Sequence, residues 1–339
     1  MRSRPPKTVT IQDVARAAGV SVSTVSRVLN DKDDVAQATY TKVQGVISEL
    51  GYASSLAAKS MRSHQTNVIG LIMPDLEESF PLEVMKGVNH AITQFNYDLI
   101  VYTNGDISKN SSAEKESQYV SLLNNNLTDG VIIVTPVATN FSTISPVVAV
   151  DPNTETPNCP YVTATNRDGG LLAMDYLLQL GHRRIGYIGG RTDLQSAIRR
   201  QQGYVDSLER AGLAVDPELV VVGDFTMAAG YRCGQRLLAL AERPTAVFAA
   251  NDRSAFGLIQ AAHELGLKIP DDLSVVGFDN IPEAAYYLPT GLTTVDQSVR
   301  HMGVVATEML IKLIRGEQID SLITKMPTQL IVRGSCRSV

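Results

Sequence analysis

Apolar residues recur at helical spacing in three short runs within the first 51 residues of the chain. The first run follows Thr10, which forms the pattern T-x-x-D with Asp13. This pattern is typical of a helix start, because the two side chains can satisfy free backbone amides. The run ends at Ala18, before Gly19, so we expect a short helix that stops at this glycine.

A second helix is predicted over residues 22–29, with Ser21 as its N-cap. Val25, Val28 and Leu29 share one face of this helix. The opposite face is small and polar and carries one cation; it consists of Val22, Ser23, Ser26, Arg27 and Asn30.

A third helix is predicted to begin at Thr39 as its cap and to end at Gly51, with apolar residues at positions 43, 46, 47 and 50. Three short helices with a glycine at the first bend indicate a helix-turn-helix. In that motif the first helix braces the second, whose exposed face enters the major groove of DNA. A plain three-helix bundle is the alternative, and the capping signals together with the local charge favour the DNA-binding reading.

The rest of the chain alternates β-rich apolar runs with amphipathic helical patterns. Runs at 68–73, 98–103, 130–135 and 147–151 predict buried parallel strands, and runs at 184–189, 219–224, 246–252 and 274–280 predict a second series. Two series indicate two α/β lobes. Because parallel sheets bind ligands beyond the carboxyl ends of their strands, the polar residues there are candidates: Asp75, Asp151, Asn251, Asp252, Asp279 and Asn280.

Charge is distributed unevenly between these parts. Residues 1–65 hold 9 Lys and Arg against 5 Asp and Glu, a balance of +4, whereas the remainder carries −9. A basic head on an acidic body predicts a polyanionic partner for the head. We expect no membrane span and no leader segment, and therefore a cytoplasmic protein, because no apolar run approaches the roughly 18 residues that a span needs.

The sequence carries no signature of a common enzyme class. It contains no GxxxxGK[ST], no GxGxxG after the first strand, no GxSxG and no HExxH. The three cysteines, Cys159, Cys233 and Cys336, form no CxxC pair, which argues against a zinc site. We expect no enzymatic activity, no cofactor and no metal; an enzyme or sugar-binding protein with an incidental helical head is the remote alternative.

The stretch VTIQDVARAAGVSVSTVSRVLN resembles the N-terminal signature of the lactose-repressor family of bacterial transcription regulators. Further segments stand in the order and spacing of that family: GYASSLAAKSMRSHQTNVIGLIMPD, LGHRRIGYIGG, RPTAVFAANDRSAFG, SVVGFDN and LTTVDQS. The resemblance implies a helix-turn-helix head over residues 1–52, a hinge over 53–66 and a periplasmic-binding-protein-like body over 67–339. Lobe one would comprise about 67–163 and 294–324, and lobe two about 164–293 and 325–339.

The resemblance also implies the sites. Effector contacts of the family fall on Asp151, Arg200, Asn251 and Asp279, with Phe225 and Phe80 as aromatic walls. Donors and acceptors of this kind suit hydroxyl groups, and an aromatic face suits the apolar side of a sugar ring. DNA contacts would come from Thr10, Ser21 and the exposed face of the second helix, and from the hinge residues Ala58, Lys59 and Met61, where Met replaces the usual leucine wedge.

We therefore predict a regulator, specifically a repressor, that binds palindromic operator DNA as a homodimer. Its final residues, IVRGSCRSV, show no heptad pattern, so a dimer is expected rather than a tetramer. The expected effector is a saccharide, and a nucleobase or nucleoside is the alternative.

Overall fold

The computed structural model describes residues 9–29, 32, 34–52, 65–74, 76, 78–103, 113–124, 127–154 and 156–339. The chain divides into two compact units, residues 1–66 and 67–339, which we call the head and the body. None of the helices in these described ranges is long and apolar enough to cross a membrane.

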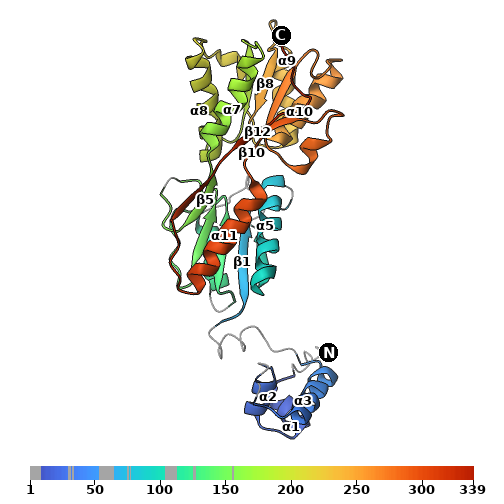
Figure 1. The fold of residues 1–339 in the computed structure, drawn as a ribbon, viewed down its shortest axis with the longest axis vertical. Helices are drawn as coiled ribbons and strands as arrows, with labels where there is room; N and C mark the ends of the chain where they lie inside the picture. The colour runs from blue at the N-terminus through green and yellow to red at the C-terminus, as the bar shows by residue number, and fades with distance from the viewer. Residues whose placement is uncertain are drawn as a thin grey trace, which may run out of the picture. The chain divides into compact units, whose positions relative to one another are not determined.

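The head contains α1 (Ile11–Ala18), α2 (Val22–Leu29) and α3 (Gln37–Leu50) around one small core (Figure 1). Gly19 ends α1 in the left-handed conformation, with φ of 65°, which turns the chain sharply into α2. The core residues come from all three helices: Val14, Ala15, Ala18, Val25, Val28 and Val43. The predicted helix-turn-helix is confirmed.

The start of the third helix differs from the prediction. Thr39 does not cap α3; the cap position is Ala36, which makes no side-chain hydrogen bond. The amides of Thr39 and Tyr40 both donate to the Ala36 carbonyl, at 2.9 and 3.0 Å, so the helix is already formed at Thr39. Backbone bonds therefore fixed this start, and no side-chain signal marked it.

Lobe one of the body is a six-stranded parallel sheet in the order β11-β5-β4-β3-β1-β2. Its strands are β1 (Val68–Met73), β2 (Asp98–Thr103), β3 (Gly130–Val134), β4 (Val147–Val150), β5 (Tyr161–Ala164) and β11 (Ile323–Met326). Helices α5 (Ser79–Phe95) and α11 (Val299–Ile314) pack on one face, and α6 (Ala113–Asn124) packs on the other. The prediction of a buried strand was wrong for β2, which lies at the sheet edge and has no fully buried residue.

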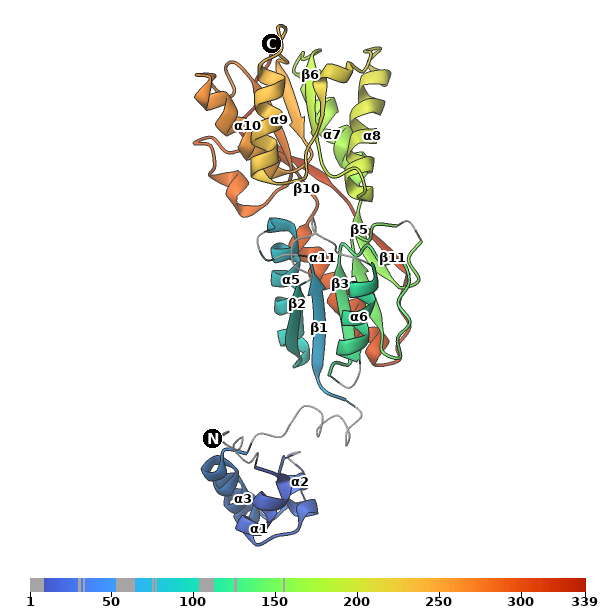
Figure 2. The ribbon, with the colours of Figure 1, turned by 180° about the vertical axis from the view of Figure 1, so that it is seen from behind.

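Lobe two is a second six-stranded sheet in the order β12-β10-β9-β8-β6-β7. Its strands are β6 (Ile185–Gly189), β7 (Val220–Val222), β8 (Ala246–Ala249), β9 (Ser274–Asp279), β10 (Thr293–Asp296) and β12 (Gln329–Ile331). Only β12 runs antiparallel to its neighbour. Helices α7 (Asn166–Gln179) and α8 (Gln195–Arg210) cover one face, and α9 (Met227–Leu238) and α10 (Asp252–Glu264) cover the other (Figure 2).

The chain passes between the lobes three times, between β5 and α7, between β10 and α11, and between β11 and β12. Figure 1 shows the result of the second passage: helix α11, coloured orange-red, lies against the strands of lobe one although it follows β10 of lobe two. The expected lobe boundary at residue 294 is too early. Strand β10 pairs with β9 through Asp296, so its residues complete the sheet of lobe two before the chain crosses.

Candidate DNA-binding surface and effector cavity

The exposed face of α2 lies where the helical pattern placed it. Val22 is 38% exposed, Ser23 and Arg27 are exposed, and Ser26 is half-buried. Ser21 Oγ accepts the Thr24 amide at 3.1 Å and so caps α2. A short polar helix held on a buried apolar face can present these side chains to base edges.

Two of the residues predicted to contact DNA have a structural task in the head. Thr10 accepts the Asp13 amide at 3.4 Å, and its own amide and hydroxyl donate to the Asp13 carboxylate at 3.0 and 2.7 Å. This reciprocal capping box fixes the start of α1. Ser21 caps α2 through its Oγ, which accepts the Thr24 amide. Of the ten predicted contacts, four lie outside the described residues: Asn30, Ala58, Lys59 and Met61.

The body contains a cavity of about 1070 Å³ that is lined by residues of both lobes. All six residues that the resemblance singled out lie on its wall: Phe80, Asp151, Arg200, Phe225, Asn251 and Asp279. Three of them, Asp151, Phe225 and Asp279, have positive φ values of 49°, 72° and 103°. Such backbone strain in residues other than glycine concentrates at functional sites, because the surrounding fold must hold it.

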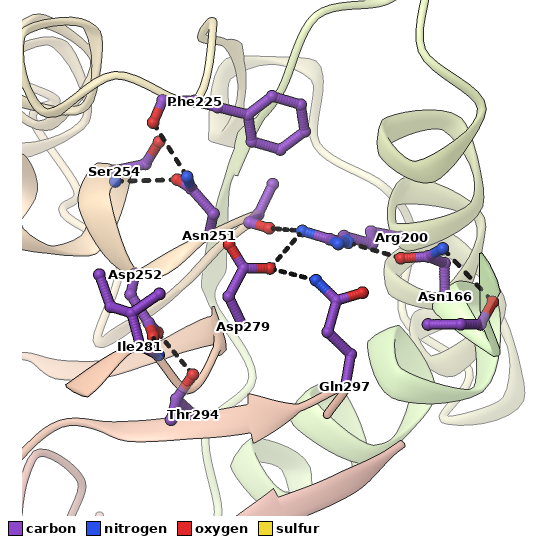
Figure 3. Close-up of polar contacts among 12 residues, drawn as sticks. Asn166, Arg200, Phe225, Asn251, Asp252, Ser254, Asp279, Ile281, Thr294 and Gln297 are labelled. Atoms are coloured by element: carbon purple, nitrogen blue, oxygen red, sulfur yellow. Dashed lines mark hydrogen bonds and ion pairs between the residues drawn. The ribbon is translucent and has the colours of Figure 1, made fainter. Parts of the chain in front are cut away.

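Arg200 and Asp279, both on the cavity wall, form a buried ion pair (Figure 3). Arg200 Nη1 lies 3.2 Å from Asp279 Oδ1 and also donates to the Ala250 carbonyl at 2.6 Å. Arg200 Nε donates to Asn166 Oδ1 at 2.9 Å, and Gln297 Nε2 donates to Asp279 Oδ1 at 2.6 Å. Four side chains are thus locked together, which presets the directions of the remaining donors and acceptors.

Burial governs the protonation of the acids on the cavity wall. Desolvation raises the pKa of the Asp279 carboxyl to about 6, although the Arg200 guanidinium opposes this shift. Desolvation also raises the pKa of Asp151, against the effects of Arg200 and of hydrogen bonds from Thr163 and Ser196. Burial therefore disfavours the charged form of both carboxyls relative to an exposed aspartate.

Two phenylalanine rings lie close to the guanidinium of the ion pair. The Arg200 guanidinium lies 3.7 Å from the centre of the Phe278 ring and 5.8 Å from that of Phe225. Phe225 occupies its position because residue 190 is glycine; a Cβ there would lie 2.1 Å from the Phe225 ring. Phe80, at the start of α5, contributes a second ring from lobe one.

Two strand-end candidates do not face the cavity. Asp252 is 0% exposed; it accepts the Thr294 hydroxyl at 2.5 Å and the Ile281 amide at 2.9 Å, and so ties α10 to the sheet. Asn280 instead accepts a bond from Arg333 at 2.8 Å. Asp75 lies outside the described residues. The end of a strand fixes where a residue stands, but not which side its side chain takes.

Asn251 lies on the cavity wall, yet its amide is already engaged. Its Oδ1 accepts the Ser254 amide at 2.9 Å, which caps α10, and its Nδ2 donates to the Phe225 carbonyl at 2.9 Å. Asn251 therefore holds the strained Phe225 backbone in place. Asn251 therefore contributes to the site by positioning Phe225, in addition to any contact that it makes with a ligand.

Sequence reasoning missed the residues that connect the two lobes. Asn153 Oδ1 of lobe one accepts the Gln195 amide of α8 at 2.9 Å, and Arg253 Nη1 of lobe two lies 3.4 Å from Ser79 Oγ. Glu116 on α6, which was also missed, acts within lobe one: it is buried on the cavity wall and accepts the amides of Val137 and Ala138 at 2.9 and 2.7 Å. No local pattern could reveal them, because each partner is distant in the sequence.

Within the described ranges, no group of three or more His, Cys, Asp or Glu is placed to hold a metal.

Comparison with known proteins assigns the class. The model of the lacI family of bacterial regulatory proteins matches residues 10–55, and that of a periplasmic binding protein-like domain matches residues 174–336. The chain is 33% identical to the HTH-type transcriptional repressor PurR of Vibrio atlanticus (strain LGP32), covering 97% of this chain and 99% of the relative. It is also 33% identical to the repressor CytR of Escherichia coli (strain K12), with full coverage of both.

Solved structures agree with this assignment. The Lac repressor bound to ONPG in its repressed state aligns with a TM-score of 0.84 at 28% identity, covering 97% of this chain and 100% of that one. The transcriptional regulator CelR in complex with cellobiose aligns with a TM-score of 0.70 at 30% identity, covering 96% and 99%. The chain is a DNA-binding transcriptional regulator with an effector-binding body, and it belongs to the lacI family.

Proposed function

We propose that this regulator is a repressor whose affinity for operator DNA is set by a saccharide in the interlobe cavity. The observation that carries the proposal is the lining itself: a guanidinium, two carboxylates and a phenylalanine ring face one space, from Arg200, Asp151, Asp279 and Phe225. Carboxylates accept from hydroxyls, guanidinium donates to them, and the ring covers an apolar sugar face.

The size of the cavity favours an oligosaccharide over a single ring. Its volume of about 1070 Å³ lies slightly above the roughly 300–1,000 Å³ typical of ligand sites. Tyr231, Arg253 and Gln260 add further polar groups to the lining. The likeness to the CelR–cellobiose complex points in the same direction.

A nucleoside is the second candidate, supported by two observations. Phe80 and Phe225 approach the cavity from opposite lobes and could enclose a flat heterocycle. The relatives PurR and CytR point to purine and nucleoside effectors through their names. We prefer the saccharide because two buried carboxylates can accept hydrogen bonds from vicinal hydroxyls. A flat heterocycle would instead be bound mainly by stacking on aromatic rings.

We further propose that the chain acts as a homodimer on a palindrome in the cytoplasm, without catalysing a reaction. One helix-turn-helix reads only a few base pairs, so two heads related by a twofold axis supply the specificity. Sedimentation of the full chain at micromolar concentration should give a dimer, and a stable tetramer would contradict this part of the proposal.

A thermal-shift screen tests the effector. Full-length protein is melted with mono- and disaccharides, including cellobiose, and with purine bases and nucleosides. We expect at least one saccharide to raise the midpoint and to change operator affinity in a gel shift, and Asp279→Asn to weaken both effects. Stabilisation by nucleosides but by no sugar would replace the saccharide with the second candidate.

A further inference from the structure

The effector-cavity ion pair is held from both sides by residues at the passages between the lobes. Asn166, which accepts from Arg200 at 2.9 Å, is the first residue of α7 and follows the first passage. Gln297, which donates to Asp279 at 2.6 Å, stands in the second passage, between β10 of lobe two and α11 of lobe one. The ion pair thus connects two crossing segments that are 131 positions apart.

Gln297 has an unusual environment for an amide. The residue is 0% exposed, and its Oε1 has no hydrogen-bond partner within the described part of the chain. Figure 3 shows its amide nitrogen facing Asp279 and its oxygen facing the opposite side. The carboxylate fixes this orientation, because a flipped amide would bring two acceptors together. Within the described residues, the Gln297 side chain bonds to Asp279 alone. An apolar side chain at this position would leave no buried acceptor unpaired, so the bond to Asp279 is the feature that distinguishes the glutamine.

The passage that holds Gln297 joins rigid parts. Its next residue, Ser298, has a φ of 55° and its amide donates to Asp296 at 2.7 Å. From Val299 onward α11 belongs to the core of lobe one, whereas β10 is paired within the sheet of lobe two. A rotation of the lobes must therefore change the backbone beside Gln297.

The other end of the network reaches the third passage. Thr165, next to Asn166, bonds to Thr328 through their hydroxyls at 3.0 Å, and the Thr165 amide donates to the Met326 carbonyl at 3.0 Å. Thr328 lies between β11 and β12, in the third passage. The path from Thr328 through Asn166, Arg200 and Asp279 to Gln297 therefore touches every passage between the lobes.

We propose that Gln297 is a positioning residue that couples the Arg200–Asp279 pair to the arrangement of the two lobes. A ligand group that draws Asp279 toward the cavity acts on the second passage through Gln297, and the same movement reaches the first passage through Arg200 and Asn166. The identity of Asp279 as an effector contact rests on the proposed function. The mechanical link does not, and it can be tested with no effector present.

Hydrogen–deuterium exchange of the full chain tests the link. Gln297→Met keeps the side-chain shape and removes its donor and its unpaired acceptor. We expect the amide of Thr165, in the first passage, to exchange about three- to thirtyfold faster in this variant, as for residues of one coupled network. Core strands β3 and β8 should exchange as in the wild type. The reciprocal variant Asn166→Ala should accelerate exchange of the Ser298 amide.

Gln202 is an exposed residue of α8, so Gln202→Leu is a matched control. This variant should leave amide exchange in both passages unchanged. If Gln297→Met accelerates exchange only between residues 293 and 300, its role is local packing and the proposal is wrong. If Gln297→Met fails to fold, Asn166→Ala provides the test on its own. Unchanged exchange of the Ser298 amide in that variant would also refute the proposed link between the two passages. A negative sugar screen would overturn the saccharide assignment without affecting either outcome.

Discussion

Arg27 Nη1 of α2 lies 3.1 Å from Asp34 Oδ2 in the loop before α3. The pair is well exposed, with side-chain exposures of 60% and 58%, so it contributes at most about 1 kcal/mol to the stability of the head. Its greater consequence concerns DNA. Arg27, the cation on the exposed face of α2, is already paired with the Asp34 carboxylate. This ion pair must break before Arg27 can contact a base.

Removing that carboxylate should strengthen DNA binding. We expect Asp34→Asn to raise affinity for operator and random DNA by up to about fivefold, because Arg27 is released and one charge that repels phosphates is lost. Fluorescence anisotropy at two salt concentrations measures this. Weaker operator binding in the variant would instead show that Asp34 orients Arg27 for base contact.

Arg27 itself should carry base discrimination. Its guanidinium can bind the two acceptors of a guanine, so Arg27→Ala should cost about 1–3 kcal/mol on the operator and relax the preference at one base pair per half-site. Binding selections on randomised half-sites measure the preference. Equal losses on operator and random DNA would make Arg27 a phosphate contact.

The raised pKa of Asp279, about 6 against an ordinary 3.8, predicts a pH effect on stability. Between these values the folded protein retains a proton that the unfolded chain has lost, so this group makes unfolding easier as pH rises through that window. Asp279→Asn removes the effect. We therefore expect the unfolding free energy of the variant, relative to the wild type, to increase from pH 4 to pH 7. A difference that stays constant in denaturant melts would show that burial does not control this carboxyl.

Arg200 cannot be truncated without cost. Arg200→Ala leaves Asp279 buried without its cation, and breaking such a pair costs about 3–5 kcal/mol. We expect a lower melting temperature together with loss of the effector response. Asp279→Asn keeps the shape of the side chain and an oxygen that accepts from Arg200, so it should weaken the response with less destabilisation. Melting temperatures and operator binding by both variants distinguish the cases. Arg200→Ala melting like the wild type would show that the pair is solvated.

Local signals were sufficient for the head. The capping box at Thr10, the glycine at position 19 and the spacing of Val25 and Val28 each act within four residues, so helix physics alone fixes them. The start of α3 was misplaced because Thr39 looks like a cap, while the first carbonyl to accept helical bonds belongs to Ala36. Eight of the twelve strands in the described part of the body were predicted, since continuous apolar runs mark strands buried on both faces. The others, β5, β10, β11 and β12, are only three or four residues long, which is too short for a distinct pattern.

Local patterns in the sequence predict the three helices of the head, eight of the twelve strands in the described part of the body, and the polar residues that follow several of those strands. Only the tertiary structure decided which of these face the cavity: Asp279 turns toward Arg200, whereas Asp252, at the carboxyl end of the neighbouring strand, turns into the interior to bind Thr294. The same holds for Gln297, whose partner lies 18 positions away and whose role depends on a chain that crosses between the lobes three times. Periodicity reports contacts within a turn or a strand, but the direction of a buried side chain depends on partners that only the folded chain brings within hydrogen-bonding distance.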